Sequence, residues 1–317
     1  MIKAYAITGP TASGKTALSL EVAKRLGCEI ISMDSMQIYR GMDIGTAKAT
    51  AEERAIAPHH CLDLLDPPDT FSANAYKEIA KAAALDIERR GKIPLFVGGT
   101  GLYLSTLLRP ECESAPESRR EYRERIEASL KTEEDRIALW EKLRSIDPES
   151  AVATHYNNVR RVIRALEIFD RTGKTKTYFD RLTRETAGEF DILHLTIDIH
   201  SRETLYKRID NRVDIMVKEG LFEEVLSLYN KGLLPPESTA AQAIGYKEII
   251  ECLERGEPED AATDRIKQAS RNLAKRQLTW FRHMAGARAL YLDTEDGAPR
   301  AFADILNEAI DYFKNKE

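Results

Sequence analysis

The sequence predicts an α/β fold in which helices flank a parallel β-sheet, with an all-helical insertion and a helical C-terminal part. Short apolar runs with strand composition recur at residues 4–8, 29–33, 93–99, 192–198 and 289–293. Helix-length segments separate most of them, and this alternation is typical of a parallel sheet covered on both faces. The interval from about Leu108 to Asp191 is too long for one crossover helix, so it predicts the insertion.

The whole-chain composition excludes several classes of protein. The chain has 317 residues, 43% of them hydrophobic, and a formal net charge of −5. No apolar run approaches the ~20 residues that span a bilayer, and no secretory signal precedes the first strand, so we expect a cytoplasmic protein without a membrane partner. The cysteines Cys28, Cys61, Cys112 and Cys252 lie far apart, which favours buried thiols over a zinc module.

The first strand leads into a glycine-rich loop that fits the pattern G-x-x-x-x-G-K-[ST]. A helical pattern follows at residues 16–26, so backbone amides and a helix N-terminus converge on anionic oxygens. The lysine adds a positive charge and the Thr16 hydroxyl can hold Mg²⁺. We expect phosphates to bind at this phosphate loop, which consists of Gly9, Pro10, Thr11, Ala12, Ser13, Gly14, Lys15 and Thr16.

Two further strands end in residues suited to the same crevice. Asp34 follows the second strand, and Thr100 lies in the turn "VGGTGLY" after the third. Because ligands bind outside the carboxyl ends of parallel strands, both side chains should face what the phosphate loop holds. The alternatives are a turn or capping role for Asp34 and no function for Thr100.

Adjacent histidines at residues 59 and 60 raise the question of a metal site. Neighbouring side chains diverge, and no third ligand lies at a suitable spacing, so we favour a structural or substrate-contacting turn. The aspartates of "DPPD", residues 66–69, are equally weak candidates for metal ligands.

The predicted insertion, residues 113–191, separates a first core segment, 1–112, from its completion at 192–317. Helical patterns cover residues 117–146 and 157–174. Within residues 119–184 there are 16 basic and 12 acidic residues, a surplus of 4 that suits RNA despite the acidic whole. Arg160, Arg161 and Arg164 recur at helical spacing and suit contacts to phosphates or loop bases, and Arg123 is a weaker candidate.

A second basic segment lies in the C-terminal part. Seven basic residues and no acidic ones occur from Arg265 to Arg288. A charge run is usually a solvated helix face, but one that also carries Trp280 and Phe281 is a candidate for contact with a nucleic-acid backbone.

Seven segments resemble, in order, those of the tRNA dimethylallyltransferase family, also called tRNA isopentenyltransferases. They are "GPTASGKT", "DSMQIYRGMDIGTAK", "HHCLDLLDP", "VGGTGLY", "RRVIRALE", "AIGYKE" and "LAKRQLTWFR". The resemblance spans nearly the whole chain. It implies a P-loop kinase-like core, and an insertion that grips the anticodon stem-loop.

The resemblance also implies an activity and roles for single residues. A dimethylallyl group would pass from dimethylallyl diphosphate to the exocyclic amine of the adenosine 3′ of the tRNA anticodon. Lys15, Arg212 and Mg²⁺ would stabilise the departing diphosphate, although spacing alone does not distinguish Arg212 from Arg208. Asp34 suits the general base and Thr100 the placement of the amine, and tRNA contacts would come from Asp34, Ser35, Met36, Gln37 and Thr100. We expect a monomer.

Other functions remain open on the sequence alone. A small-molecule or nucleoside kinase would use the phosphate loop for ATP, but it would not need the basic insertion. An adenylate isopentenyltransferase would prenylate a free nucleotide, which has no stem to grip. A non-enzymatic RNA-binding protein is disfavoured by the convergence of Lys15, Asp34 and Thr100.

Overall fold

The computed structural model describes residues 1–109, 119–185 and 188–315. It divides into two compact units, one made of residues 1–107 with 190–317 and the other of residues 108–189. Both junctions lie a few residues before the boundaries proposed from the sequence. Cys112 and the first two residues of the helical pattern at 117–146 lie outside the described residues.

The first unit is built on a six-stranded parallel sheet with strand order β3-β2-β4-β1-β5-β6. The predicted α/β class is therefore confirmed. The shortest strand was missed because two residues are too few to form a recognisable pattern. The strands are β1 (Ile2–Thr8), β2 (Cys28–Ser32), β3 (His59–His60), β4 (Ile93–Gly98), β5 (Phe190–Asp198) and β6 (Ala287–Tyr291).

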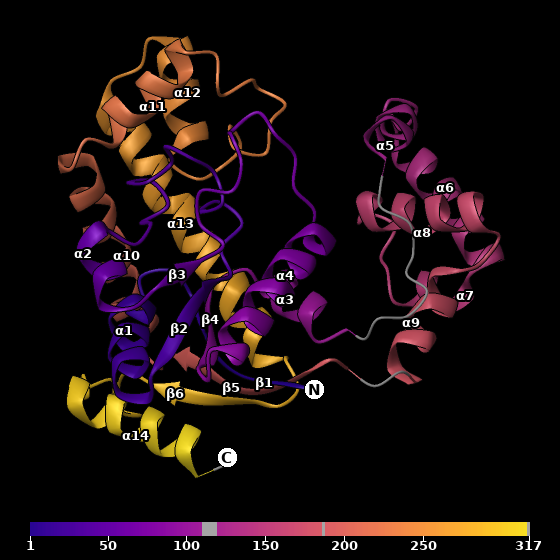
Figure 1. Ribbon diagram of the computed structural model, residues 1–317. Helices are drawn as coiled ribbons and strands as arrows, with labels where there is room; N and C mark the ends of the chain where they lie inside the picture. The colour runs from indigo at the N-terminus through magenta and orange to yellow at the C-terminus, as the bar shows by residue number, and fades with distance from the viewer. Residues whose placement is uncertain (110–118, 186–187, 316–317) are drawn as a thin grey trace. The chain divides into compact units, whose positions relative to one another are not determined.

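Helices cover both faces of this sheet (Figure 1). Tyr5 and Ile7 of β1 pack in one buried cluster, and Ala4 and Ala6 pack in another, as the two-residue period of a strand requires. The first cluster is completed by α1 (Lys15–Leu26) and α14 (Phe302–Lys314), and Tyr5 stacks on Phe313 of α14. The second contains residues of α3 (Ala73–Arg89) and α4 (Gly101–Leu107).

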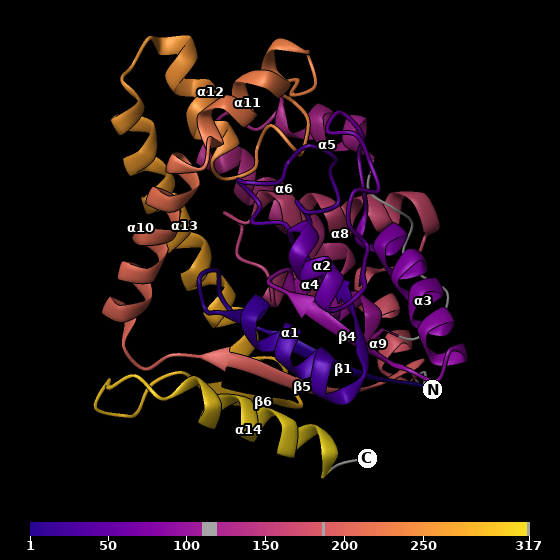
Figure 2. The same cartoon turned by 60° about the vertical axis from the view of Figure 1, so that its left-hand side comes forward.

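A further helical layer lies beyond the carboxyl ends of the strands and is shared by distant parts of the chain. It contains α10 (Arg202–Lys218), α11 (Leu221–Asn230), α12 (Tyr246–Arg255) and α13 (Glu259–Arg282). Helices α10 and α13 pack side by side (Figure 2). The Glu224 carboxylate of α11 accepts hydrogen bonds from the backbone N–H groups of residues 43–45 and from the Tyr246 hydroxyl. The segment after β2 is thereby fastened to the C-terminal helices.

The remaining helix of the first unit is α2 (Ala51–Ile56), which starts with a capping box between Thr50 and Glu53. Cys28, Cys61 and Cys252 are buried free thiols, as expected. None of the helices in the described part of the chain combines the length and apolar composition that a membrane crossing needs.

The second unit is all-helical where it is described. It contains α5 (Arg120–Glu127), α6 (Glu133–Ile146), α7 (Pro148–Val152), α8 (Val159–Thr172) and α9 (Lys176–Glu185). Its small core includes Leu143, Val162 and Leu166, so α8 buries its apolar stripe as the helical spacing predicts. The buried Asp147 carboxylate accepts hydrogen bonds from Ser150 and Thr177, which joins α7 to α9.

Candidate active site

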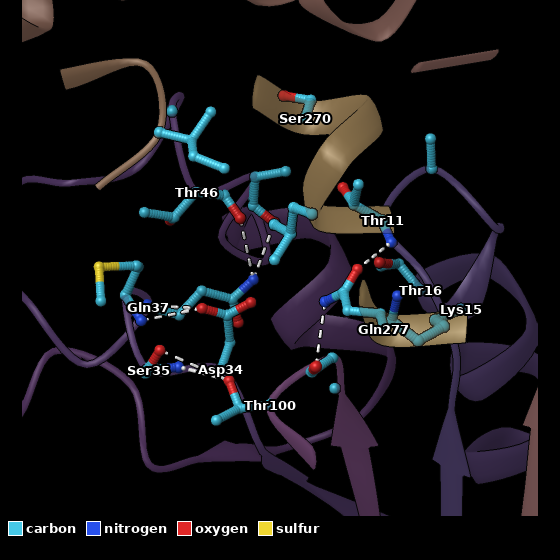
Figure 3. A pocket seen from close by; sticks show the side chains of 18 of the residues that line it. Thr11, Lys15, Thr16, Asp34, Ser35, Gln37, Thr46, Thr100, Ser270 and Gln277 are labelled. Carbon is cyan, nitrogen blue, oxygen red and sulfur yellow. Dashed lines mark hydrogen bonds between the residues drawn. The ribbon is translucent and has the colours of Figure 1, made fainter. Parts of the chain in front are cut away.

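A cavity of about 540 Å³ lies at the carboxyl ends of β1, β2 and β4. All of the residues that line it belong to the first unit. Figure 3 shows that Lys15 and Thr16 lie on one side of this cavity and that Asp34, Ser35 and Thr100 lie on another. The three segments that the sequence assigns to one crevice therefore meet in a single cavity.

The backbone of the phosphate loop takes conformations that suit a tight anion-binding turn. Gly14 is left-handed with φ of 83°, Ala12 has φ of 60°, and α1 begins at Lys15 with no acidic residue in its first turn. A Cβ on Gly9 would lie 2.9 Å from the carbonyl oxygen of Ile197, so the loop also requires glycine there. The buried Ser13 hydroxyl oxygen has no hydrogen-bond partner among the described residues, which fits a site built to receive additional polar atoms.

The Lys15 ammonium group is held by carbonyl oxygens of its own loop. Its Nζ donates hydrogen bonds to the carbonyl oxygens of Gly9 at 3.0 Å and Pro10 at 2.6 Å. The pKa of Lys15 is lowered to about 7, chiefly by burial and secondly by the positive charge of Arg212, while the negative charge of Asp34 acts in the opposite direction. Because burial disfavours the charged form of Lys15, an anion that enters the cavity stabilises this ammonium group.

Arg212 of α10 lines the cavity, whereas Arg208 does not. Burial lowers the pKa of Arg212, and the Asp34 carboxylate raises it in part, so these two groups interact electrostatically. The Arg208 guanidinium instead lies beside Gly14, 3.2 Å from the position of a Cβ built there. The tertiary structure thus distinguishes two arginines that the sequence could not.

Asp34 and Thr100 lie in neighbouring turns that are joined by hydrogen bonds. Asp34 Oδ1 accepts the backbone N–H groups of Met36 at 2.9 Å and Gln37 at 3.4 Å, so the expected turn role is real. Thr100 Oγ1 accepts the N–H of Ser35 at 3.1 Å. These turns can lie this close because residue 98 is glycine: a Cβ there would be 2.2 Å from the carbonyl oxygen of Met33.

Residues 35–37 all line the cavity, but the side chain of Gln37 is engaged in hydrogen bonds within the protein. Gln37 is committed within the protein: its Oε1 accepts from Ser32 Oγ, and its Nε2 donates to the carbonyl oxygens of Thr46 and Ala47. Ser35 and Met36 line the cavity, as does Gln37. Any contact of Gln37 with a bound base would therefore come at the expense of these internal hydrogen bonds.

The sequence analysis missed Gln277 of α13 as a site residue. Its amide bonds to Thr11 of the phosphate loop and to Gly99 of the turn after β4 (Figure 3). The segment "LAKRQLTWFR" contains it, but helical spacing does not say which of its residues reaches the cavity. Ser270 of α13 also lines the cavity and was missed for the same reason, and so do residues 242–245, which lie in the turn before α12 and have no pattern that indicates a site.

The arginines proposed for RNA contact lie in the second unit and differ in exposure. The side chain of Arg160 is 81% exposed, with Glu127 at 3.8 Å, and Arg161 is exposed as well. Arg164 is less available, since its guanidinium donates at 2.8 Å to the buried Glu167 carboxylate. Arg123 lies on α5 and is half-buried.

The basic segment at residues 265–288 is largely neutralised by acidic residues from other parts of the chain. Five of its seven basic residues form ion pairs. Lys275 and Arg276 are exposed and form no ion pair with any described residue. These two residues are therefore the basic side chains of the segment whose charge is not already paired within the described part of the chain. The five pairs are Arg265–Glu257, Lys267–Asp214, Arg271–Asp210, Arg282–Asp198 and Arg288–Glu308.

The adjacent histidines are engaged separately. His60 Nε2 lies 2.8 Å from the buried Glu29 carboxylate, and His59 Nδ1 lies 2.8 Å from the carbonyl oxygen of Ala57. Among the described residues, no three histidine, cysteine, aspartate or glutamate side chains are grouped as metal ligands. The cavity does offer Thr16 and Asp34, hard oxygen donors of the kind that Mg²⁺ takes in small number together with phosphate oxygens.

Comparison with known proteins identifies the relatives of this chain. A family model described as IPP transferase matches residues 37–284, and one described as isopentenyl transferase matches residues 2–57. The tRNA dimethylallyltransferase of Bacillus velezensis is 48% identical over 278 residues, 87% of each chain. That of Geobacillus thermodenitrificans is 44% identical over 315 residues, 99% of this chain and 97% of the relative.

Solved structures identify the same family. The full-length tRNA isopentenylpyrophosphate transferase from Bacillus halodurans matches with a TM-score of 0.72 and 40% identity over 100% of this chain and 97% of that chain. A eukaryotic dimethylallyltransferase, captured in crystallographic snapshots acting on tRNA, matches with a TM-score of 0.80 and 30% identity, covering 99% of this chain and 80% of that chain. The matches span both units of the structure, and the chain belongs to the IPP transferase family.

Proposed function

We propose that this protein transfers a dimethylallyl group from dimethylallyl diphosphate to the exocyclic amine of the adenosine 3′ of the tRNA anticodon, releasing diphosphate. The observation that carries the proposal is the single cavity shared by the phosphate loop and the Asp34–Thr100 pair. One side suits an anionic leaving group and the other suits an amine nucleophile. The relatives named as tRNA dimethylallyltransferases support the same activity.

In this proposal the phosphate loop stabilises the leaving group. The bond between the allylic carbon and the bridging oxygen breaks, and its electron pair leaves with the diphosphate. Loop amides, the unpartnered Ser13 hydroxyl, Lys15 and Arg212 are donors for the growing negative charge. Preorganised donors of this kind each contribute about 3 to 4 kcal/mol to transition states that develop an oxyanion. A bound Mg²⁺, held by Thr16 and the diphosphate, would supply further positive charge there.

Asp34 acts on the nucleophile. Its Oδ1 is held by the turn, and the described residues offer no hydrogen bond to its Oδ2. The exocyclic amine, placed by Thr100, forms the new carbon–nitrogen bond, and Asp34 accepts the proton that this bond makes acidic. A base that stays stacked in the anticodon loop cannot reach groups at the ends of the strands, so the adenosine flips out of the loop.

The second unit would hold the RNA. Its exposed arginines, Arg160 and Arg161 foremost, suit phosphate contacts on the anticodon stem-loop, with Arg164 and Arg123 as lesser contributors. In the main unit, Asp34 to Gln37 and Thr100 would contact the target nucleotide. One chain supplies every group that the reaction needs, so we propose a monomer, acting in the cytoplasm.

The test is a transfer assay with undermodified tRNA, Mg²⁺ and dimethylallyl diphosphate labelled in the allyl group. We expect label on a single adenosine next to the anticodon after nuclease digestion and nucleoside mapping. Label on free AMP but not on tRNA would favour an adenylate isopentenyltransferase. Phosphate transferred from γ-labelled ATP to an acceptor would favour a kinase and refute the proposal.

A further inference from the structure

Gln277 links the two halves of the active-site cavity. Its Oε1 accepts the backbone N–H of Thr11, in the phosphate loop, at 2.8 Å. Its Nε2 donates to the carbonyl oxygen of Gly99 at 3.0 Å. Gly99 immediately precedes Thr100, so one amide group connects the part of the chain that faces the leaving group to the part that faces the nucleophile.

The helix that carries Gln277 is firmly anchored on both sides of it. Ala274 and Leu278 are buried in a cluster with Ile199, Leu205 and Ile209. Near the end of the helix, Arg282 donates hydrogen bonds of 2.8 Å and 2.7 Å to the two carboxylate oxygens of Asp198, at the end of β5. Helix α13 is therefore a fixed support rather than a mobile flap.

The turn after β4 is shaped to receive this helix. A Cβ on Gly99 would lie 2.2 Å from Gln277 Nε2, and a Cβ on Gly101 would lie 2.3 Å from the Trp280 indole ring. The two glycines on either side of Thr100 thus lie directly against side chains of α13, and a side chain at residue 99 would displace the Gln277 amide. The glycines of this turn therefore allow a close approach of α13.

We propose that Gln277 is a positioning residue that sets the separation between the diphosphate and the acceptor amine. It acts through the Thr11 amide on the phosphate loop and through the Gly99 carbonyl on Thr100. This inference rests on the proposed function, because it assigns a leaving group to one turn and a nucleophile to the other. Gln277 itself need not touch either substrate.

A positioning residue can affect catalysis strongly because the rate of group transfer depends steeply on the distance and alignment of the reacting atoms. Reacting atoms must be held about 3 to 3.5 Å apart and in line, and an error of about 1 Å costs roughly a hundredfold in rate. Diphosphate affinity depends more on Lys15, Thr16 and the other loop amides, whereas Gln277 hydrogen-bonds to the loop only through Thr11 among the described residues. Loss of Gln277 should therefore lower kcat much more than it weakens diphosphate binding.

Two substitutions test the role. Gln277→Met keeps the length but removes both hydrogen bonds, so kcat for tRNA should fall by about tenfold to a hundredfold. The KM for dimethylallyl diphosphate should change by less than about threefold, as expected when an interaction acts in the transition state. The matched control is Gln268→Met on the exposed face of α13, where Gln268 bonds to Arg271 and Asn272 and to no other residue that the structure describes. It should keep the wild-type kcat.

Gln277→Glu adds a readout that a purely structural role would not give. The ionised carboxylate accepts from Thr11 but repels the Gly99 carbonyl, whereas the protonated carboxyl group both accepts and donates, as the amide does. The ratio of the variant's kcat to the wild-type kcat should therefore rise as the pH falls from about 8 to 5.5. A flat ratio would overturn the proposal, as would a wild-type kcat for Gln277→Met.

A measurement independent of activity separates this inference from the proposed function. Amide hydrogen exchange in a peptide covering residues 9–16 should be faster in Gln277→Met than in the wild type, because Thr11 loses its acceptor. If exchange is faster in Gln277→Met but the wild-type protein transfers no label to tRNA, the role of Gln277 in holding the loop is supported and only the proposed function is refuted. Unchanged exchange would show that Gln277 does not hold the loop.

Discussion

Asp34 offers the sharpest test of the mechanism because one of its carboxylate oxygens holds the turn and the other can accept a proton. Oδ1 closes the turn through the N–H groups of Met36 and Gln37. Asn has the same shape, keeps an oxygen in that place and favours the same kind of turn. Asp34→Asn should thus keep the turn and lower the free energy of unfolding by less than Asp34→Ala does.

Its effect on the reaction should be far larger. A positioned general base contributes about 10² to 10⁴ in rate, which corresponds to ~2.7 to 5.4 kcal/mol in the activation free energy. Diphosphate affinity should stay the same or improve, since the variant removes a negative charge that interacts with Lys15 and Arg212 in the same cavity. The two effects together distinguish a base from a phosphate or metal ligand, whose loss would weaken binding.

The assay is single-turnover transfer of labelled dimethylallyl to undermodified tRNA, with diphosphate binding measured separately by calorimetry. Asp34→Ala is the companion variant, because it loses the turn as well as the base. It should unfold with about 1 to 2 kcal/mol less free energy than Asp34→Asn while transferring no faster. A rate for Asp34→Asn within threefold of the wild type would show that Asp34 is only a turn residue.

Other parts of the structure lead to further predictions. The pKa of Lys15 is lowered to about 7 and a bound anion raises it, so the wild-type protein should take up a proton when it binds diphosphate at pH 8, and Lys15→Met should not. Calorimetry in buffers of different ionisation enthalpy measures the proton uptake, and equal uptake by the two proteins would contradict the assignment. Replacing Arg160 and Arg161 with Ala should weaken tRNA binding. The slope of log affinity against log salt concentration should become less steep by about 0.7 to 1 for each phosphate that the protein no longer neutralises, and an unaltered slope would mean that the RNA lies elsewhere. Gly98→Ala should lower the thermal midpoint and the transfer rate together, since its Cβ would lie 2.2 Å from the Met33 carbonyl oxygen and force the Asp34 turn away; a midpoint like that of the wild type would refute the clash.

Local patterns were enough to predict much of this protein. The five longer strands were found because each is a compact apolar run, and α8 because its buried residues recur at the helical period. The phosphate loop was found because its spacing encodes a local backbone shape, in which Gly14 adopts a positive φ and α1 starts at Lys15. Such features depend on neighbours within a few residues, so one sequence determines them.

Contacts between distant parts of the chain were decided only by the tertiary structure. The sequence could not choose Arg212 over Arg208, since both lie on α10 and only packing determines which one lines the cavity. It left the basic segment at residues 265–288 as either a solvated helix face or a candidate for nucleic-acid contact, and only the structure shows that most of its charges pair with acidic residues. It also assigned no role to Gln277, whose two partners belong to loops that are remote along the chain. The sequence by itself determined the five longer strands, helix α8 and the phosphate loop. Folding decided which side chains complete the site, because their partners come from segments that no local spacing relates.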